Sequence, residues 1–481
     1  MLPEVARGLP PVLAELDAYL DDAALFEPFR PYFSATQGRP SIPMETYLRM
    51  MLLKLRCQVG YERLCEDVTD SVSWRLFCKV PIGAAVPDAS TLEKITSRCG
   101  RAAIRELNEA LLKKANAAKL IKLDKVRADT TIIPANVAYP TDSGLLAKGV
   151  ARLAVLTKRL KEMGLGARTK VRDRRRSMNA HAHEIGAWLR RRNDEAKDEV
   201  LAITAEMAEI AEAALAEALQ LAANAGRGIR RRRQAAPKRA QATLAELKDV
   251  AATLEKVLAQ TKQRLRGQVP DGAGRVVSFH DKDARPIRKG RLGKPVEFGE
   301  KAQVCDNSDG VVVDYEVMLG NPADAPLLAP ALRRIKALFA KVPRLATADR
   351  GYGEAKVEAE LVELGVKKVA IPRKGKPSAT RRKIESAPGF RNAVKWRTGS
   401  EGRIASLKRS FGWGRSLMDG TAGTATWCGW GVFASNAMKI AHLAAERELP
   451  PAPERQRPAG ERHSSGPPGK PPPPPAPLLA A

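Results

Sequence analysis

The sequence of 481 residues lacks the features of a secreted or membrane protein. No apolar run approaches the roughly 18 residues that a membrane-spanning helix requires, and the N-terminus shows no signal-peptide pattern. The six cysteines, at positions 57, 65, 78, 99, 305 and 428, form no CxxC pair. We therefore expect reduced thiols, without disulfides or a cysteine zinc site, in a cytoplasmic protein that has no membrane partner.

Acidic residues are also few relative to basic ones. The chain has 54 Asp and Glu against 82 Lys and Arg, which gives a net charge of +28 and a pI of about 10.0. A charge of this size favours a polyanionic partner, and nucleic acid fits better than a membrane surface. We expect a nucleoid-associated protein of two or three domains.

Residues 1–120 predict an N-terminal domain made of helices. Met44–Leu55 has helical apolar spacing after Pro43, and helix-like segments follow at Tyr61–Val68 and Asp70–Phe77. Pro87–Leu92 predicts the start of another helix. Short helices joined by tight turns on a basic chain fit a DNA-binding domain of the helix-turn-helix kind, but they fit a packing or dimerisation domain equally well.

Proline is almost absent from residues 146–268, which are rich in Ala, Leu, Glu, Lys and Arg. This composition predicts a basic helical insertion of two or more long helices, with an interruption at Gly226–Gly228. Three basic clusters have few acidic neighbours in the sequence: Arg174–Arg176, Arg190–Arg192 and Arg230–Arg233. They are candidates for contacts with phosphates, and the alternative is a solvated helical face.

Strand patterns flank this insertion on both sides. The expected strands lie at 125–133, 275–280, 296–305, 310–318, 345–349 and 368–371, with helices at 324–341 and 354–364 and a hairpin turn at Asn307–Gly310. The fold class is therefore α/β, with a mixed sheet interrupted by the helical insertion. We expect the catalytic domain to comprise residues 121–145 and 269–447, and residues 448–481 to be a disordered proline-rich tail.

Three carboxylates within the predicted catalytic domain are suited to metal binding. Asp129 lies in the strand-like run before Pro134, Asp349 ends another such run before the turn residues Arg350–Gly353, and Glu401 opens a helical stretch. Hard divalent cations prefer oxygen ligands of this type. Asp129, Asp349 and Glu401 are therefore the candidate catalytic and metal-binding residues.

The spacing around Glu401 carries a family resemblance. Arg397, Glu401 and Lys408 match a helix pattern of tyrosine, two residues, arginine, three residues, glutamate, six residues and lysine, although Val394 replaces the tyrosine. The chain resembles the DDE transposases of bacterial insertion sequences that carry this pattern, over roughly residues 30 to 440. Further similar segments are Ala128–Thr131, Tyr139–Leu145, Gly293–Gly299, Gly320–Asp324 and Ala348–Tyr352.

This resemblance implies a ribonuclease-H-like catalytic core and an N-terminal domain that binds or helps bind the element ends. It implies two Mg²⁺ ions, with Mn²⁺ as a substitute, held by Asp129, Asp349 and Glu401. The expected partners are double-stranded DNA, as terminal inverted repeats and as target, and a second copy of the chain in a homodimer. The expected reaction is cleavage at the element ends followed by strand transfer. The alternative is a catalytically inactive DNA-binding protein or regulator derived from a transposase.

Several cations near Glu401 are candidates for DNA contacts. Lys408 lies seven residues after Glu401, on the same face of a continuous helix. We expect Arg397 and Lys408 to contact phosphates beside the scissile bond, and the alternative is pairing with surface carboxylates. Arg403, Arg409 and Arg350 are further candidates for backbone contacts.

Other acids and aromatic residues have competing roles. We interpret Asp142 as a turn or cap residue, and Glu354 is too close to Asp349 in the sequence to replace Glu401 readily. Asp281, Asp283, Asp314 and Glu300 are further nearby acids. His181 and His183 do not have metal-ligand spacing. Base stacking is conceivable for Trp413, whereas Trp427 and Trp430 are expected in the core.

Overall fold

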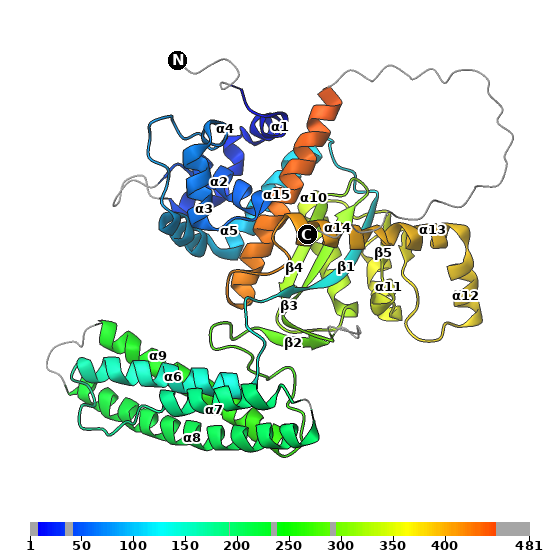
Figure 1. Ribbon diagram of the computed structural model, residues 1–481. Coiled ribbons are helices and arrows are strands. Elements are labelled where there is room, and N and C mark those ends of the chain that lie inside the picture. Colours follow the sequence, from blue (N-terminus) through cyan, green and yellow to red (C-terminus); the bar gives the residue numbers. More distant parts are fainter. Residues whose placement is uncertain (1–7, 34–41, 192, 232–237, 289–294, 449–481) are drawn as a thin grey trace, which may run out of the picture.

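The computed structural model describes residues 8–33, 42–191, 193–231, 238–288 and 295–448 (Figure 1). The proline-rich segment 449–481, Arg192, Arg232, Arg233 and residues 289–294 therefore lie outside the described residues. Within the described part, no helix is long and apolar enough to cross a membrane.

A six-stranded mixed sheet occupies the centre of the molecule. Its strands are β1 (Lys125–Pro134), β2 (Arg285–Arg288), β3 (Val296–Asn307), β4 (Val312–Met318), β5 (Leu345–Ala348) and β6 (Lys368–Ala370). The main strand order is β4–β3–β1–β5–β6, and β2 pairs with the first residues of β3. β1, β3 and β4 are antiparallel, whereas β1, β5 and β6 are parallel. The predicted hairpin is present, because Gly310 takes the left-handed φ of 76° between β3 and β4.

Helices on the sheet position the predicted site. α10 (Leu328–Phe339) packs on β4 and on α11 (Ala355–Glu363), and α12 (Ala379–Ser386) packs on α13 (Pro388–Arg397). α13 lies on β5 and β6, and α14 (Gly399–Ser410) lies on β1 and β3. The fold class is therefore the predicted mixed α/β class, with a ribonuclease-H-like sheet.

The N-terminal helices share one hydrophobic core with the sheet and with the last helix, α15 (Gly420–Glu448). The N-terminal elements are α1 (Pro11–Leu20), η2 (Ala23–Leu25), η3 (Glu27–Tyr32), α2 (Met44–Cys57), α3 (Tyr61–Asp70), α4 (Val72–Phe77) and α5 (Ala89–Ala117). α15 packs against α1, α2 and α5 (Figure 1). α2 is buried from Thr46 to Leu55, so this helix supports packing and has no free face for a DNA groove.

The helical insertion between β1 and β2 is a four-helix bundle with its own core. Its helices are α6 (Asp142–Glu162), α7 (Arg175–Trp188), α8 (Asp194–Arg230) and α9 (Lys238–Leu265), drawn in cyan and green in Figure 1. The predicted interruption at Gly226–Gly228 is wrong, since α8 continues to Arg230. Glycine weakens a helix by only about 1 kcal/mol, and packing against α6 and α9 outweighs that cost.

The strand predicted at 275–280 is also wrong. Val276 exchanges backbone hydrogen bonds with the side chain of Gln260 on α9, and Phe279 enters the core of the bundle. The apolar residues that suggested a strand therefore serve helix packing. Strand β2 lies later, at Arg285–Arg288, and pairs with β3.

Candidate functional site

Asp129 and Asp349 lie side by side where the parallel pairing of β1 with β5 stops; Asp129 lies inside β1, and Asp349 directly follows β5. β1 and β5 pair up to Ala128 and Ala348, and each aspartate is the next residue in the sequence. Asp129 Oδ1 accepts a hydrogen bond from the backbone N–H of Thr130 at 2.8 Å, and Asp349 Oδ1 accepts one from Gly351 at 2.9 Å. The sheet register therefore brings together two residues that are far apart in the sequence.

The two aspartates concentrate negative charge in a partly buried place. Burial raises the pKa of Asp129 to about 6, and the charges of Asp349 and Glu401 add to this rise. Burial also raises the pKa of Asp349, with a contribution from Asp324. Such carboxylates favour a nearby cation, because ionised groups of like charge repel each other in a poorly solvated site.

Arg397 supplies a positive charge between the aspartates and Glu401. Arg397, the last residue of α13, has Nη1 at 3.5 Å from Asp129 Oδ2 and Nη2 at 3.9 Å from Glu401 Oε1. Glu401 lies in the first turn of α14, and its side chain is 74% exposed. The structure thus gathers the three predicted acids around one guanidinium, with Glu401 at the solvent side.

The donor set suits a hard divalent cation, although the described residues contain no group of three His, Cys, Asp or Glu already arranged around an ion position. Carboxylate oxygens are the ligands that Mg²⁺ prefers. Burial, with the charges of neighbouring acids, raises the pKa of both Asp129 and Asp349. A divalent ion at these carboxylates would relieve that repulsion.

The other predicted DNA-contacting cations lie in different environments. Lys408 Nζ donates a hydrogen bond to the carbonyl of Ile132 on β1 at 2.8 Å, which fixes α14 to the strand. Arg403 is partly buried and faces Asp306 and the β3–β4 hairpin, where it contacts Gly310. Arg350 and Arg409 are exposed. Arg403 is therefore engaged in the protein interior, whereas Arg350 and Arg409 are open to a ligand.

Asp324 is a residue near the site to which we assigned no role from the sequence. Its Oδ1 accepts a hydrogen bond from Thr130 Oγ1 at 3.1 Å and lies 2.5 Å from Lys301 Nζ. Its negative charge also raises the pKa of Asp349. The signal in the sequence was the Gly320–Asp324 segment, which resembled the family without indicating a function for its last residue.

The alternative acids have other partners. Asp314 is buried against Arg334 and Arg105, and Asp142 pairs with Arg264 inside the bundle. Thr141 caps α6, so Asp142 is the residue after the cap. Asp281 accepts bonds from the backbone N–H groups of Asp283 and Ala284, and Asp283 accepts one from Thr421. Glu354 pairs with Lys374 at the surface.

Trp413 is fully buried, so the base-stacking role considered for it is wrong. Its Nε1–H donates to the carbonyl of Cys428, and the residue belongs to the main core. Trp427 and Trp430 are buried in the same core, as expected. Val394, at the family's tyrosine position, lies on α13 and packs against a small core that contains Ala370 of β6 and Phe390.

The basic clusters of the bundle are partly neutralised. Arg174 makes a two-pronged ion pair with Glu217, and Arg175 pairs with Asp173. The expectation of few acidic neighbours overlooked Asp173, which directly precedes the first cluster, and could not include Glu217, which lies on another helix, α8. Arg176, Arg190 and Arg230 are exposed.

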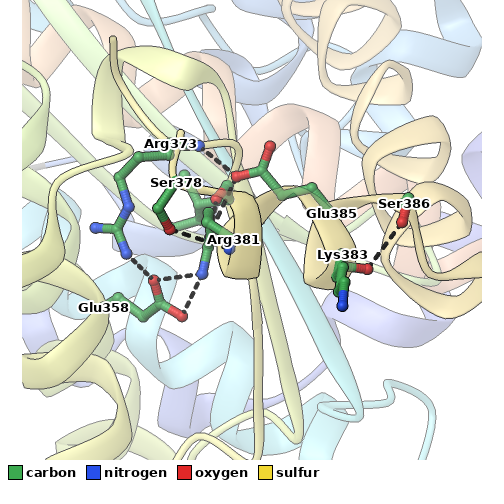
Figure 2. Close-up of polar contacts among 8 residues, drawn as sticks. Glu358, Arg373, Ser378, Arg381, Lys383, Glu385 and Ser386 are labelled. Carbon is green, nitrogen blue, oxygen red and sulfur yellow. Dashed lines mark hydrogen bonds and ion pairs between the residues drawn. The ribbon is translucent and has the colours of Figure 1, made fainter. Parts of the chain in front are cut away.

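A polar network between α11 and α12 holds α12 in place (Figure 2). Arg381 donates to both carboxylate oxygens of Glu358 on α11 at 2.9 Å and to Glu385 at 2.8 Å. Arg373 reaches the same two glutamates, through its side chain to Glu358 and its backbone N–H to Glu385. The guanidinium of Arg381 also lies over Phe390 on α13. These contacts fix the helix that carries Arg397.

Comparisons with known proteins match both ends of the chain. The family described as Transposase domain (DUF772) matches residues 7–98, and the family described as Transposase DDE domain matches residues 280–437. The second match contains Asp349 and Glu401. Asp129 lies outside this match, because the four bundle helices separate it from residues 280–437 in the sequence.

A curated protein of Rhizobium meliloti, the uncharacterized protein ORF8 in the nfe locus, is 30% identical over 136 residues. The matched segment covers 27% of this chain and 64% of that protein. No solved structure matches the chain significantly. Taken with Asp129 and Asp349, which lie side by side where β1 and β5 stop pairing, the two family matches support the identification of the chain as a DDE transposase of insertion sequences.

Proposed function

We propose that this chain cleaves phosphodiester bonds at the ends of its insertion sequence and transfers the freed strands into target DNA. The observation that carries the proposal is the position of Asp129 and Asp349 side by side where β1 and β5 stop pairing, with Arg397 between Asp129 and Glu401. This arrangement combines oxygen ligands for a cation with a positive group for a phosphate.

Asp129, Asp349 and Glu401 would hold the divalent cations, with Mg²⁺ as the expected ion and Mn²⁺ as a substitute. When bound, two such ions neutralise charge on the attacking and leaving oxygens of a phosphodiester. Asp129 is the central ligand of the proposal, because it lies beside Asp349 and contacts the arginine that reaches Glu401. Glu401 is exposed and carries the ligand role on the solvent side.

The cations of this chain would bind and orient DNA. Arg397 already contacts two carboxylates, so a cation bound there would leave its guanidinium available to a phosphate oxygen. Arg350 and Arg409 are exposed and would contact the backbone further out, whereas Lys408 would act chiefly by fixing α14 to β1. Synapsis of two inverted repeats would require a homodimer.

The first prediction concerns Asp349. Asp349→Asn should abolish Mg²⁺-dependent cleavage of a duplex that carries the element end, because the amide cannot supply the negative charge that holds the ion. Binding of the uncleaved duplex should persist. Gel assays of strand cleavage and fluorescence anisotropy of binding measure the two properties separately.

Glu354→Gln is the matched control, since Glu354 is an exposed acid five residues away that pairs with Lys374. It should cleave like the wild type. Full cleavage by the Asp349→Asn protein would refute the assignment. Binding without cleavage by the wild-type protein would favour the inactive regulator.

A further inference from the structure

Arg127 lies on β1, two residues before Asp129, and reaches the junction between α13 and α14. Its Nη1 donates a hydrogen bond to the carbonyl of Trp396 at 2.8 Å, and its guanidinium lies 4.7 Å from the centre of the Trp396 ring. That carbonyl belongs to the last turn of α13, where regular helical partners run out. Arg127 therefore closes the end of α13 one residue before Arg397.

The other edge of the Arg127 guanidinium is fixed by Asp306 on β3. Nε and Nη2 donate to the two carboxylate oxygens of Asp306 at 2.9 and 2.7 Å. The side chains of Arg127 and Asp306 are only 11% and 1% exposed. A buried, two-pronged ion pair fixes the plane of the guanidinium, which a single ammonium group cannot reproduce.

Gly399, the first residue of α14, packs directly on this guanidinium. A Cβ at position 399 would lie 2.1 Å from Nη1 and 2.8 Å from Cζ of Arg127. The close approach therefore requires glycine at this position. Arg403, one turn further along α14, also faces Asp306, with Nε at 3.7 Å from Oδ2. Both sides of the helix junction are thus held to the same buried ion pair.

We propose that Arg127 is a positioning residue that fixes Arg397 and Glu401 relative to Asp129. Arg397 follows Trp396 directly, and Glu401 lies two residues after Gly399, so the contacts of Arg127 bracket the junction that carries both groups. Arg127 itself touches no catalytic carboxylate in these contacts. The inference rests on the proposed function and extends it from the three acids to the residue that aligns them.

The test compares Arg127→Lys with Arg334→Lys. Arg334, on α10, makes an equivalent two-pronged pair with the buried Asp314 at 2.9 and 2.7 Å. Asp314 lies on β4, the strand beside β3, and these two hydrogen bonds do not involve α13 or α14. Both substitutions should lower the thermal midpoint. Only Arg127→Lys should weaken Mn²⁺ binding without DNA, measured by calorimetry, by about tenfold or more, as expected when a group that orients ligands is altered.

Arg127→Lys should also raise the Mg²⁺ concentration for half-maximal cleavage by a similar factor, while end binding stays within about twofold of wild type. Gly399→Ala is a second, independent variant, because its methyl group displaces the guanidinium; it should show the same shift. Wild-type metal affinity in both variants would overturn the proposal, as would an equal loss of metal affinity in Arg334→Lys. The calorimetric result stands even if the wild-type protein fails to cleave, which would overturn only the proposed function.

Discussion

At the residue scale, the site is organised by how each charge is compensated. Arg397 contacts Asp129 and Glu401, whereas Arg403 and Lys408 are directed to a buried carboxylate and to a strand carbonyl. Arg397, Arg403 and Lys408 look equivalent in the spaced motif, but Arg397 contacts two of the predicted acids, whereas Arg403 and Lys408 hold α14. The division follows from which strand atoms each helical side chain meets.

Glu300 gives a pH-dependent prediction that is separate from catalysis. Its side chain is fully buried on β3, and burial, with the nearby charge of Asp281, raises its pKa from 4.5 to about 7. Between these values the folded protein binds a proton that the unfolded chain has lost, so stability falls as the pH rises. The expected loss from this group is roughly 3 kcal/mol across that window.

Urea denaturation at pH 5 and pH 7.5 measures this loss for the wild type and for Glu300→Gln, which cannot ionise. The difference in unfolding free energy between the two pH values should be smaller in Glu300→Gln than in the wild type by roughly 3 kcal/mol. Glu363→Gln, a change of an exposed acid at the end of α11, is the control for the general effect of removing one acid. Identical pH dependence in wild type and Glu300→Gln would contradict the prediction.

At the element scale, the segment around Glu401 forms two separate helices, α13 and α14. The spacing of Arg397, Glu401 and Lys408 suggested one continuous helix, but α13 ends at Arg397 and α14 begins at Gly399. Glu401 and Lys408 still share a helix, and Arg397 still reaches Glu401 across the junction. The break lets α13 pack on β5 and β6 while α14 packs on β1 and β3.

The bundle helices carry exposed arginines that should contribute to nonspecific DNA affinity. Replacing Arg176, Arg190 and Arg230 together by Gln should weaken binding to any duplex without changing sequence preference. If each contacts one phosphate, the slope of log affinity against log salt should fall by about 3. Fluorescence anisotropy over a salt series, with an element-end duplex and an unrelated duplex, measures both properties.

Lys341, Lys356 and Lys367 form the control set, because they are exposed and their replacement by Gln removes the same total charge. A slope change no larger than that of the control set would show that the bundle arginines form a solvated face. A change confined to the element-end duplex would instead indicate sequence-specific contacts.

At the scale of the whole molecule, the N-terminal helices and the last helix, α15, share one hydrophobic core. Trp430 on α15 stacks against Phe29 and Tyr47, and Phe433 belongs to the same core. The bundle, in contrast, buries its apolar residues among its own four helices and Phe279. Residues 420–448 therefore complete the core of the N-terminal helices, although they lie at the other end of the described sequence.

This difference predicts how fragments behave. Residues 1–120 alone should lack a cooperative thermal transition, because the partners of Phe29 and Tyr47 on α15 are missing. Residues 142–280, which retain the core of the bundle, should keep their helix content and melt cooperatively. Circular dichroism of both fragments measures this, and a stable, cooperatively folding 1–120 fragment would contradict it and support an autonomous N-terminal domain.

The sequence by itself determined most of the elements, and it proposed the three candidate acids. Strand runs, turn residues and helical spacing are local features, and they placed β1, β3, β4, β5 and β6, with Asp129 inside β1 and Asp349 directly after β5. Local patterns failed where another element used the same residues, as in segment 275–280, whose backbone and apolar side chains pack on α9.

Only the tertiary structure decided which groups meet. The register of β1 with β5 placed Asp129 beside Asp349, and helix packing brought Arg397 to them, Asp324 to Thr130 and Glu217 to Arg174. The role of Arg127 likewise depends on Asp306, Trp396 and Gly399, which lie more than 170 residues away in the sequence. Such contacts are set by the packing of whole strands and helices, because the free energy of a buried ion pair depends on partners that no local pattern specifies.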